Sequence, residues 1–474
     1  MDSTVSEGLT AKSATELVAL IRSRAVSSAE VVKAHLQRIE RLNPQLNAIV
    51  ALAPDAMDRA RVADAALAKG EDAGPLHGLP VTVKDTIETA GLRTTSGSRL
   101  LADHVPDRDA LVVARLKSAG AIIIGKTNTP EMAAYYESDN PVFGHTNNPH
   151  NLLMTPGGSS GGEAAAIAAC LSPAGIGSDL AGSIRLPASF CGIAGLKPTM
   201  GGVPFAGHIP EVTGSLSLGA SIGPMARTVA DVGLLFEVIA DAESPPSVYS
   251  QPDDLRGIRA AWYVNDGVAP VDEETARAVE RAADALRGAG LEVEQAEPPG
   301  ISQGFRLWLE LFSTSVNSQL SEFYRGREDE AGPQVAAMLA KANERDQGLA
   351  AKVAEAERLA KAIVERERLR AELLEWMKTT PILIAPVGST PAFGHGARRV
   401  EVHGESISVW RAFSYSQTFN VFGLPSIAVP AGRSAKRLPI GVQIVGQPFA
   451  ERTILAVAAI IEQALGGWQR PPKF

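Results

Sequence analysis

Two adjacent serines in a glycine-rich loop are the first residues whose types and spacing suit catalysis. Ser159 and Ser160 lie in the stretch TPGGSSGGEA, between two glycine pairs and just before an alanine-rich run. Glycine adopts backbone conformations that other residues avoid, and its freedom in the unfolded chain weakens folding. A loop with this composition is therefore expected to need an unusual backbone shape. A reactive serine in it would also need a base.

A further serine and a lysine offer a second arrangement. Ser183 follows DLAG, a run of small residues after an expected strand, where backbone N–H groups could converge as an oxyanion hole. Lysine serves as the base on several unrelated folds, provided that burial lowers its pKa from about 10.4. Lys84 ends the apolar stretch LPVTVKD, which suits such burial. An ion pair between Lys84 and Asp85 at the end of the strand is an equally valid interpretation.

The stretch GGSSG also matches G-x-S-x-G, the nucleophile elbow of α/β-hydrolases. That elbow requires a buried strand directly before the serine and a helix directly after it. A helix is expected after Gly161, but the preceding NPHNLLMTP is polar and broken by prolines. A triad histidine is also needed, and His208, His395 and His403 have no flanking pattern that assigns one of them to this role. We therefore do not expect Ser159 to be an elbow nucleophile.

The stretch GAIIIGKT, residues 120–127, matches the phosphate-binding pattern G-x-x-x-x-G-K-T. A P-loop needs a strand before its first glycine, a loop whose N–H groups surround the phosphate, and a helix directly afterwards. In this chain a helix is expected before the first glycine, residues 121–124 are expected to form a core strand, and Pro130 interrupts the segment that follows. The sequence therefore argues against ATP binding here.

Length and composition indicate a large globular enzyme. The chain has 474 residues, 45% of them hydrophobic and 21% charged, which allows a sizeable core. A net charge of −8 does not favour nucleic acid or an anionic membrane as a partner. The start lacks a signal-peptide pattern, and no run of about 20 apolar residues predicts a membrane span. Only two cysteines are present, which favours the cytoplasm. The sequence leaves open whether the chain forms a homodimer.

Helical and strand patterns alternate along most of the chain, which predicts an α/β sandwich on a mostly parallel sheet. Helices are expected over about 10–70, with Ser13 and Ser28 as caps. Strands are expected in LPVTVKD, AIIIG, AGIGS, GIAGLKPT, PILIAPV, LPSIAVPAG and LPIGVQIVG.

A charged helical segment is expected over about 305–377, and it carries an apolar stripe. The stripe consists of Leu349, Val353, Ala356, Leu359 and Ile363. The segment is either a solvated layer packed on the body or a cap that shapes a substrate entrance. Because strands return after it, we expect residues 1–474 to form a single domain with this segment as an insertion.

Together the motifs resemble the amidase signature family. The similarity covers most of the chain and is densest in GPLHGLPVTVKD, GKTNTPE, PGGSSGGEAAAIAA, GIGSDLAGSIRLPASFCGIAGLKPT and GPMARTVAD. It extends to the late LPSIAVPAG and LPIGVQIVG. The resemblance implies a large mixed and mostly parallel β-sheet sandwiched between helices. It also implies an amidase that needs no metal and no organic cofactor.

The resemblance further implies roles for individual residues. Ser183 would be the nucleophile, Ser159 a bridging serine and Lys84 the general base, and the proton would pass from Ser183 through Ser159 to Lys84. The peptide bond before Ser159 is expected to be cis. The oxyanion would be bound by N–H groups of Leu180, Ala181 and Gly182, together with that of Ser183. Supporting positions are Gly158, Ser160, Asp179 and Arg185.

One departure from the family pattern concerns the oxyanion loop. The family usually has threonine or isoleucine and then Gly-Gly-Ser where this chain has LAGS. Ala181 adds a Cβ that glycine lacks and so restricts φ. The expected shape of this loop, though not of the triad, is therefore in question.

The stretch KTNTPEMAAYYESDNPVFGHTNNPH bears on the substrate, because it is more similar to fatty-acid-amide and aryl-amide hydrolases than to a tRNA-linked relative. Met132, Tyr135 and Tyr136 are candidates for lining an acyl or aryl pocket, or the two tyrosines merely pack a loop. We expect the partner to be a small-molecule amide, apolar or aryl, hydrolysed through a serine acyl-enzyme. Aryl esters and carbamates are further expected substrates, as for a urethanase or esterase.

The alternative function is that of the amidase-type component of a glutamyl-tRNA amidotransferase complex, which shares the same triad. Two features argue against it. One is the charged helical insertion, and the other is GASIGPMARTVAD, interpreted as a loop of a free-standing amidase.

Overall fold

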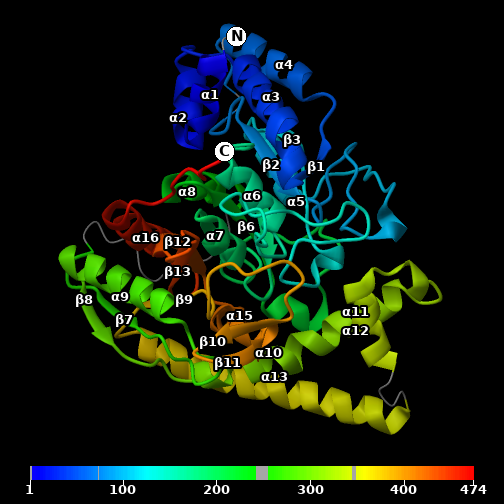
Figure 1. Ribbon diagram of the computed structural model, residues 1–474, viewed down its shortest axis with the longest axis vertical. Coiled ribbons are helices and arrows are strands. Elements are labelled where there is room, and N and C mark those ends of the chain that lie inside the picture. Colours follow the sequence, from blue (N-terminus) through cyan, green and yellow to red (C-terminus); the bar gives the residue numbers. More distant parts are fainter. Residues whose placement is uncertain (1–2, 73, 242–254, 344–347) are drawn as a thin grey trace.

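An 11-stranded β-sheet forms the centre of the molecule (Figure 1). The computed structural model describes residues 3–72, 74–241, 255–343 and 348–474. Across the sheet the strands are β1 (Ile49–Leu52), β3 (Ile122–Thr127), β2 (Pro80–Lys84), β4 (Ala174–Asp179), β6 (Ser221–Ala226), β5 (Ala194–Lys197), β12 (Ser426–Arg433), β13 (Pro439–Val445), β9 (Ile382–Pro386), β7 (Arg259–Trp262) and β8 (Glu292–Gln295). A separate antiparallel pair consists of β10 (Arg399–Val402) and β11 (Glu405–Ser408).

The large sheet is mixed, as expected, but its pairs are not mostly parallel. Only β3–β2, β2–β4, β9–β7 and β7–β8 are parallel. The other six neighbouring pairs are antiparallel. One reason is β6, part of the stretch interpreted as a loop, which enters between β4 and β5 and runs antiparallel to both. Another is the short connection between β12 and β13, since only antiparallel neighbours can be joined so directly.

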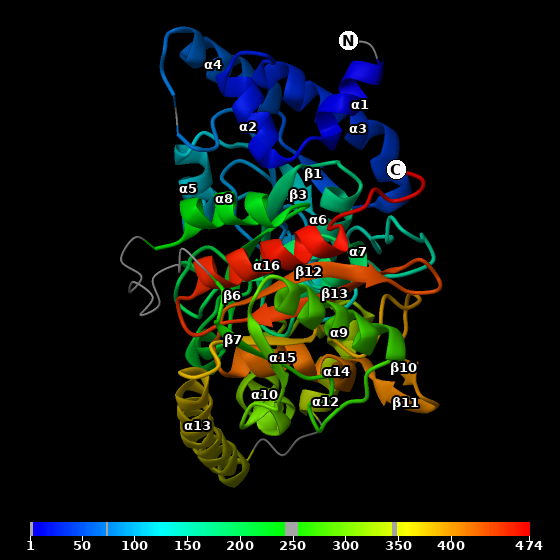
Figure 2. The ribbon, with the colours of Figure 1, turned by 90° about the vertical axis from the view of Figure 1, so that its left-hand side faces the viewer.

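Helices cover the sheet and extend beyond its first strand (Figures 1 and 2). They are α1 (Ser3–Ala11), α2 (Ala14–Arg22), α3 (Ser28–Leu46), α4 (Ala56–Ala68), α5 (Leu111–Ser118), α6 (Gly161–Ala168), α7 (Arg185–Cys191), α8 (Val229–Ile239), α9 (Glu273–Gly288), α10 (Gly304–Trp308), α11 (Thr314–Phe323), α12 (Pro333–Asn343), α13 (Leu349–Met377), α14 (Val409–Ala412), α15 (Ser414–Val421) and α16 (Glu451–Leu465).

Side chains of alternate residues along the strands enter two different cores. Ile382 and Ile384 of β9 pack with α2, α5, α8, α9 and α16, whereas Leu383 and Ala385 pack with α6, α7, α13 and α15. Successive side chains of a strand point to opposite faces, so a strand covered by helices on both sides is apolar throughout. The α/β sandwich expected from the sequence is therefore confirmed.

The N-terminal helices begin at serine caps, one of which differs from the expected residue. Ser13 caps α2 through a reciprocal pair of hydrogen bonds with Glu16. The cap of α3 is Ser27, not Ser28, because Glu30 lies three residues after Ser27 and completes the same reciprocal pair. The four helices occupy one end of the molecule (Figures 1 and 2).

The charged segment after residue 303 contains the helices α10, α11, α12 and α13, with a π-helical turn at Leu309–Ser313 between α10 and α11. The long helix α13 lies at the end of the molecule opposite the N-terminal helices (Figures 1 and 2). Its Leu359 and Ile363 pack against the core, whereas Val353 is 50% exposed. Within the described ranges, no helix has the combined length and apolarity that crossing a bilayer requires.

Candidate active site

Lys84 is the last residue of β2, and its side chain is fully buried. The alternation of the strand places Val83 in one core and turns Lys84 toward the opposite face. There its Nζ lies 2.5 Å from Ser159 Oγ and 3.0 Å from Ser178 Oγ. The structure thus brings together two of the three residues predicted to form the triad, and adds a hydroxyl that the sequence analysis did not identify.

The environment of Lys84 favours its neutral form. Burial lowers the pKa of Lys84 to about 7, although the charges of Asp179 and Glu163 oppose the change. The alternative ion pair with Asp85 is wrong, since none of the ion pairs among the described residues joins Lys84 to it. Instead, the Asp85 carboxylate accepts hydrogen bonds from the N–H and the hydroxyl of Thr95, at 3.1 and 2.5 Å.

The serine loop that contains Ser159 connects to α6. The peptide bond between Gly158 and Ser159 is cis, as expected. A Cβ at Gly158 would lie 2.8 Å from the backbone of Tyr135 and Glu137, so no larger residue fits there. Close backbone packing therefore fixes the position of the Ser159 hydroxyl beside Lys84.

Ser160 connects this loop to the segment that carries Ser183. Its N–H donates to the Ser183 carbonyl at 3.1 Å. Its hydroxyl donates to the Ser178 carbonyl and accepts from the Ser178 N–H, both at 3.3 Å. The side chain is fully buried and faces β4, away from Lys84. These contacts place Ser160 where it can support the loop, without a contact to the base.

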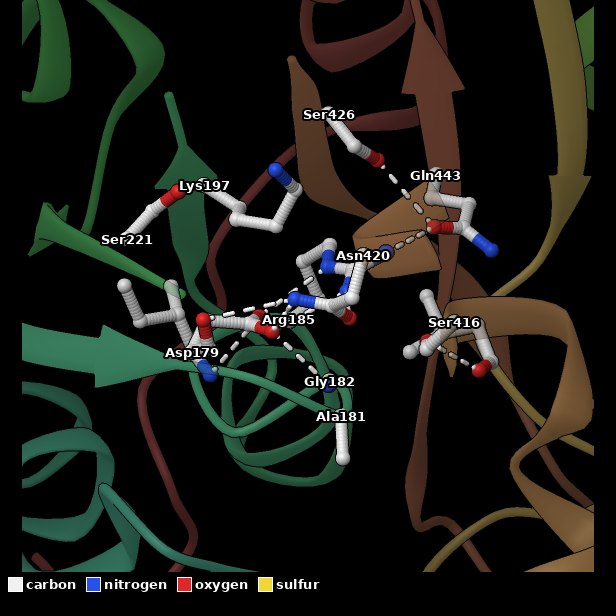
Figure 3. Close-up of polar contacts among 12 residues, drawn as sticks. Asp179, Ala181, Gly182, Arg185, Lys197, Ser221, Ser416, Asn420, Ser426 and Gln443 are labelled. Atoms are coloured by element: carbon white, nitrogen blue, oxygen red, sulfur yellow. Dashed lines mark hydrogen bonds and ion pairs between the residues drawn. The ribbon is translucent and has the colours of Figure 1, made fainter. Parts of the chain in front are cut away.

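A buried ion pair holds the loop before Ser183 (Figure 3). Asp179 accepts two hydrogen bonds from the Arg185 guanidinium, both at 3.0 Å, and one from Asn420 at 2.9 Å. Arg185 also donates to Asn420 at 2.6 Å and to Gln443 at 2.8 Å. Burial alone would raise the pKa of Asp179, but Arg185 and these hydrogen bonds hold it well below its usual range.

The geometry of the oxyanion loop corrects one predicted donor. Asp179 also accepts the Gly182 N–H at 2.8 Å, so this N–H is not available to a substrate. The Trp308 indole donates to the Leu180 carbonyl at 3.0 Å, and the Tyr136 hydroxyl donates to the Ala181 carbonyl at 2.9 Å. With their carbonyls held in this way, Leu180 and Ala181 keep N–H groups that donate to no acceptor within the described residues.

Ala181 does not disturb the shape of this loop. Its φ is not among the positive values, whereas that of Gly182 is +101°. A Cβ at Gly182 would also lie 2.8 Å from the Cβ of Ser416. Glycine is therefore required at residue 182 and not at residue 181. This explains how LAGS can stand where the family usually has Gly-Gly-Ser.

Ser183 and Ser159 face the same cavity, which has a volume of about 290 Å³. Within the described residues, no hydrogen bond joins the hydroxyls of the two serines. The predicted pocket residues Met132, Tyr135 and Tyr136 line this cavity. The remaining lining is largely apolar and aromatic and includes Phe205, Leu216, Trp308, Val316, Leu320, Met338 and Trp410.

Helices of the charged segment form part of the wall of this cavity. Trp308 and Trp410 stack with their ring centres 5.4 Å apart, and Tyr135 meets Trp410 edge to face at 5.9 Å. Residues of α11 and α12, such as Leu320 and Met338, also line the space. The first part of the charged segment, from α10 to α12, therefore shapes the cavity, whereas no described residue of α13 lines it. That the segment forms a substrate entrance stays a prediction.

Three buried polar residues near Lys84 are absent from the site predicted from the sequence, where His208 is considered only as an elbow histidine. Ser178 lies on β4 and accepts a hydrogen bond from Lys84, and His208 lies 2.9 Å from Ser178 Oγ. Glu163 on α6 accepts hydrogen bonds from Thr82 and Thr127. Burial raises the pKa of Glu163 to about 7. A glutamate at the start of an otherwise apolar helix was the one available signal for this group.

Neither the P-loop pattern at residues 120–127 nor the elbow pattern at Ser159 has the structure that its motif needs. Lys126 lies within β3, and its buried Nζ donates to Ile87, Thr89 and Thr94 rather than facing a phosphate site. No described strand ends directly before Ser159, although α6 follows.

The downstream histidines also fail to form an elbow triad. His395 binds Glu137 at 2.8 Å, and His403 lies 2.9 Å from the Val271 carbonyl. His208 binds Ser178, not Ser159. In the described part of the chain, no group of His, Cys, Asp and Glu side chains has the arrangement of a metal site.

A buried lysine beside serine hydroxyls at an apolar cavity is an arrangement typical of hydrolases that use lysine as the base instead of histidine. The family model described as Amidase matches residues 30–455. The chain therefore belongs to the amidase family, whose members hydrolyse amides, and the predicted resemblance is confirmed.

Individual relatives are of two kinds. The curated relatives include the A component of the glutamyl-tRNA(Gln) amidotransferase of Carboxydothermus hydrogenoformans, which is 35% identical over 95% of this chain and 96% of its own. Relatives from other bacteria carry the same name. The solved structure of 6-aminohexanoate cyclic dimer hydrolase with substrate has a TM-score of 0.84 at 29% identity and covers 98% of this chain and 99% of its own. A bacterial aryl acylamidase has a TM-score of 0.83 at 26% identity and covers 96% of each chain.

Proposed function

We propose that the protein hydrolyses small apolar or aryl amides, with Ser183 as nucleophile, Ser159 as bridging serine and Lys84 as base. The observation that carries this proposal is the contact between the buried Lys84 and Ser159 at the cavity that Ser183 also lines. A lysine with a pKa of about 7 has a neutral fraction large enough to take a proton at physiological pH.

In the first half of the reaction, Ser183 Oγ forms a bond to the carbonyl carbon of the amide. Its proton passes to Ser159, whose own proton passes to the neutral Lys84. The carbonyl electron pair moves onto oxygen, where the free N–H groups of Leu180 and Ala181 stabilise the negative charge, together with the N–H of Ser183. When the carbon–nitrogen bond breaks, the proton returns from Lys84 through Ser159 to the leaving amine.

In the second half, water replaces the amine. The same relay removes a proton from water, whose oxygen attacks the acyl carbon, and returns that proton to Ser183 Oγ as the acyl–oxygen bond breaks. The products are the carboxylic acid and the regenerated serine. Every proton transfer uses a residue of this chain.

The cavity lining supports an apolar or aryl substrate. Trp308, Trp410 and Tyr135 present aromatic rings, which stack on aryl groups and bury apolar chains. We also propose that aryl esters and aryl carbamates are cleaved, because their carbonyl carbons undergo the same attack and form the same oxyanion.

The test combines a substrate panel with a covalent probe. Purified protein should release 4-nitroaniline from acyl 4-nitroanilides and 4-nitrophenol from acyl esters, and it should cleave aryl carbamates. A fluorophosphonate should form a bond from phosphorus to Ser183 Oγ and lose fluoride. An adduct on Ser159, or an untouched panel, would contradict the proposal.

A second candidate is a component of an amidotransferase complex, and the curated relatives named above favour it. The loop interpretation of GASIGPMARTVAD no longer argues against it, because this stretch contains β6 in the middle of the sheet. Two charged residues at the cavity, Glu211 and Lys341, could also bind the α-ammonium and the α-carboxylate of a glutamine. Release of ammonia from glutamine only with co-purified partner proteins, and no turnover of the aryl panel, would establish this function instead.

We also propose that the whole chain acts as one catalytic domain, since the serine loop, β4 and the helices α10, α11 and α12 all border one cavity. The two cysteines, Cys170 and Cys191, are free and buried. Their state suits a reducing compartment, and we propose the cytoplasm.

A further inference from the structure

His208 forms the end of a buried hydrogen-bond chain that starts at Lys84. Lys84 Nζ lies 3.0 Å from Ser178 Oγ, which lies 2.9 Å from His208 Nε2. The other ring nitrogen, Nδ1, lies 2.9 Å from the Pro210 carbonyl. His208 is not one of the three proposed triad residues. The centre of its ring lies 4.6 Å from the centre of the Phe205 ring.

The direction of each hydrogen bond in this chain follows from the Pro210 carbonyl, which His208 contacts. A carbonyl oxygen only accepts, so the Pro210 carbonyl requires the hydrogen to be on Nδ1 of His208. In a neutral imidazole Nε2 then accepts, and Ser178 must donate its hydroxyl hydrogen to it. Because the hydroxyl hydrogen of Ser178 is donated to His208, Ser178 Oγ can only accept from Lys84. Lys84 must therefore donate an N–H to Ser178.

Backbone contacts hold His208 at this place relative to Lys84. His208 pairs with Ile87 in an antiparallel bridge, and the Ile209 N–H donates to the Thr86 carbonyl at 2.7 Å. Thr86 and Ile87 lie two and three residues after Lys84, the last residue of β2. The position of the ring is therefore set from the same short stretch of chain as the position of the base.

We propose that His208 is a positioning residue, which keeps the Ser178 hydroxyl from donating into the lone pair of Lys84 and so leaves that lone pair to Ser159. This inference rests on the proposed function, in which Lys84 is the base. Without an acceptor at position 208, the Ser178 hydroxyl would turn and donate to neutral Lys84. The lone pair would then be occupied when Ser159 must deliver its proton.

The charges around the two groups keep this arrangement in place at neutral pH. Burial, with the nearby Lys84 and Lys126, lowers the pKa of His208 to about 3, so the ring stays neutral. On its other sides Lys84 faces the carboxylates of Asp179 and Glu163. His208 therefore orients hydrogen bonds and does not itself take up the proton.

The experiment compares His208→Leu, which removes the acceptor, with His208→Gln, whose amide oxygen restores one. The readout is the rate at which a fluorophosphonate labels Ser183 across pH, with kcat and KM for an acyl 4-nitroanilide. His208→Leu should slow labelling by about tenfold or more with little change in KM, since general-base catalysis contributes about 10²–10⁴-fold. His208→Gln should recover much of that labelling rate. The pH at which the labelling rate is half-maximal should be higher in His208→Gln than in His208→Leu.

A double-mutant cycle with Ser178→Ala makes the test specific. Removing the Ser178 hydroxyl removes the competing donor, so His208→Leu should cost almost nothing in that background. Equal losses with and without Ser178, or no recovery by His208→Gln, would overturn the inference. Should His208→Leu fail to fold, His208→Phe provides the same comparison with a ring that accepts nothing.

His35 offers a matched control, because it is also a fully buried histidine whose pKa burial lowers to about 3. Its Nδ1 contacts the Leu171 carbonyl, and it does not line the cavity. His35→Leu should lower thermal stability and leave the labelling profile unchanged. If wild-type protein is neither labelled nor active, or if Lys84→Ala labels normally, the proposed function fails. If wild-type activity depends on Lys84 but not on His208, this inference alone fails.

Discussion

Lys84 Nζ lies 2.5 Å from Ser159 Oγ, whereas no hydrogen bond among the described residues connects the hydroxyls of Ser159 and Ser183. The proposed base and the proposed bridging serine are thus already in contact, whereas the proposed nucleophile is not yet hydrogen-bonded to them. Catalytic hydrogen bonds often tighten only when substrate binds. We therefore expect the second contact of the relay to form with an acyl group in the cavity.

Alanine variants of the three residues should lose activity to different degrees. Ser183→Ala should abolish both turnover and fluorophosphonate labelling, because no acyl-enzyme can form. Ser159→Ala should keep a slow rate, and Lys84→Ala should be most impaired at low pH. Ser172→Ala is a suitable control, since Ser172 is a buried serine whose hydroxyl donates to the Ala174 carbonyl. Labelling of Ser183→Ala at another serine would refute the assignment.

Activity should rise with pH around neutrality. Lys84 acts as a base only when neutral, and its pKa is about 7, so kcat/KM should fall as the pH drops below that value and level off above it. The measurement is the pH profile of kcat/KM with a 4-nitroanilide, whose chromophore does not titrate in this range. A flat profile from about pH 5 to about pH 9 would exclude Lys84 as the base.

Glu163→Gln should shift that profile to lower pH. The Glu163 charge favours protonated Lys84, so a neutral amide lowers the pKa of Lys84 and more of the base is free at a given pH. The midpoint of kcat/KM is the measurement. Asp231→Asn is the matched control, because Asp231 is a buried carboxylate that caps α2 through Ala14 and Thr15. This control should lose stability while its midpoint stays in place.

Gly182→Ala and Ala181→Gly should have opposite outcomes although they affect neighbouring residues. Gly182 has φ of +101°, and a Cβ added to it would lie only 2.8 Å from the Cβ of Ser416. An added methyl should therefore destabilise the protein by about 1–3 kcal/mol and displace the loop before Ser183. Ala181→Gly removes one methyl at ordinary φ and should keep most activity. Denaturant unfolding and kcat measure the two effects. A tolerated Gly182→Ala would mean that the loop is not as tightly held as its contacts indicate.

Trp410→Ala should affect aryl substrates more than short aliphatic ones. The ring stacks on Trp308 and meets Tyr135 at the cavity wall, and aromatic contacts contribute about 0.5–1.5 kcal/mol beyond burial. KM for an aryl amide should rise several-fold, with a smaller change for an acetyl amide. Trp468→Phe is the control, since Trp468 packs under Arg227 and does not line the cavity. Equal changes for both substrates would argue against an aryl site.

The sequence predicted the residues that lie in local motifs. Lys84 could be found because a lysine ends an apolar strand, and Ser159 because glycines surround it. The contact between Ser178 and His208 could not be predicted, because it joins β4 to an irregular segment and leaves no periodic pattern. The use of the Gly182 N–H by Asp179 is also a property of the folded loop, since the sequence does not show which way an amide points.

Sheet order was less predictable than the existence of the strands. The strand β6 contains a proline and a glycine, which are typical of loops, yet it lies between β4 and β5 with six buried residues. Tertiary pairing outweighs local preference in this strand. The helix pair α11 and α12 could be predicted as helical, but its position at the cavity depends on packing that no local pattern encodes.

The contact between Arg185 and Gln443 joins the loop before Ser183 to a strand that is synthesised late (Figure 3). A ribosome delivers the chain from its N-terminus, so Lys84, Ser159 and Ser183 emerge long before β13, the strand that carries Gln443. Until β13 pairs with the sheet, the Arg185 guanidinium that binds Asp179 lacks one of its buried acceptors. We therefore expect the loop before Ser183 to be incompletely held in a nascent chain, so that activity develops only near the end of synthesis.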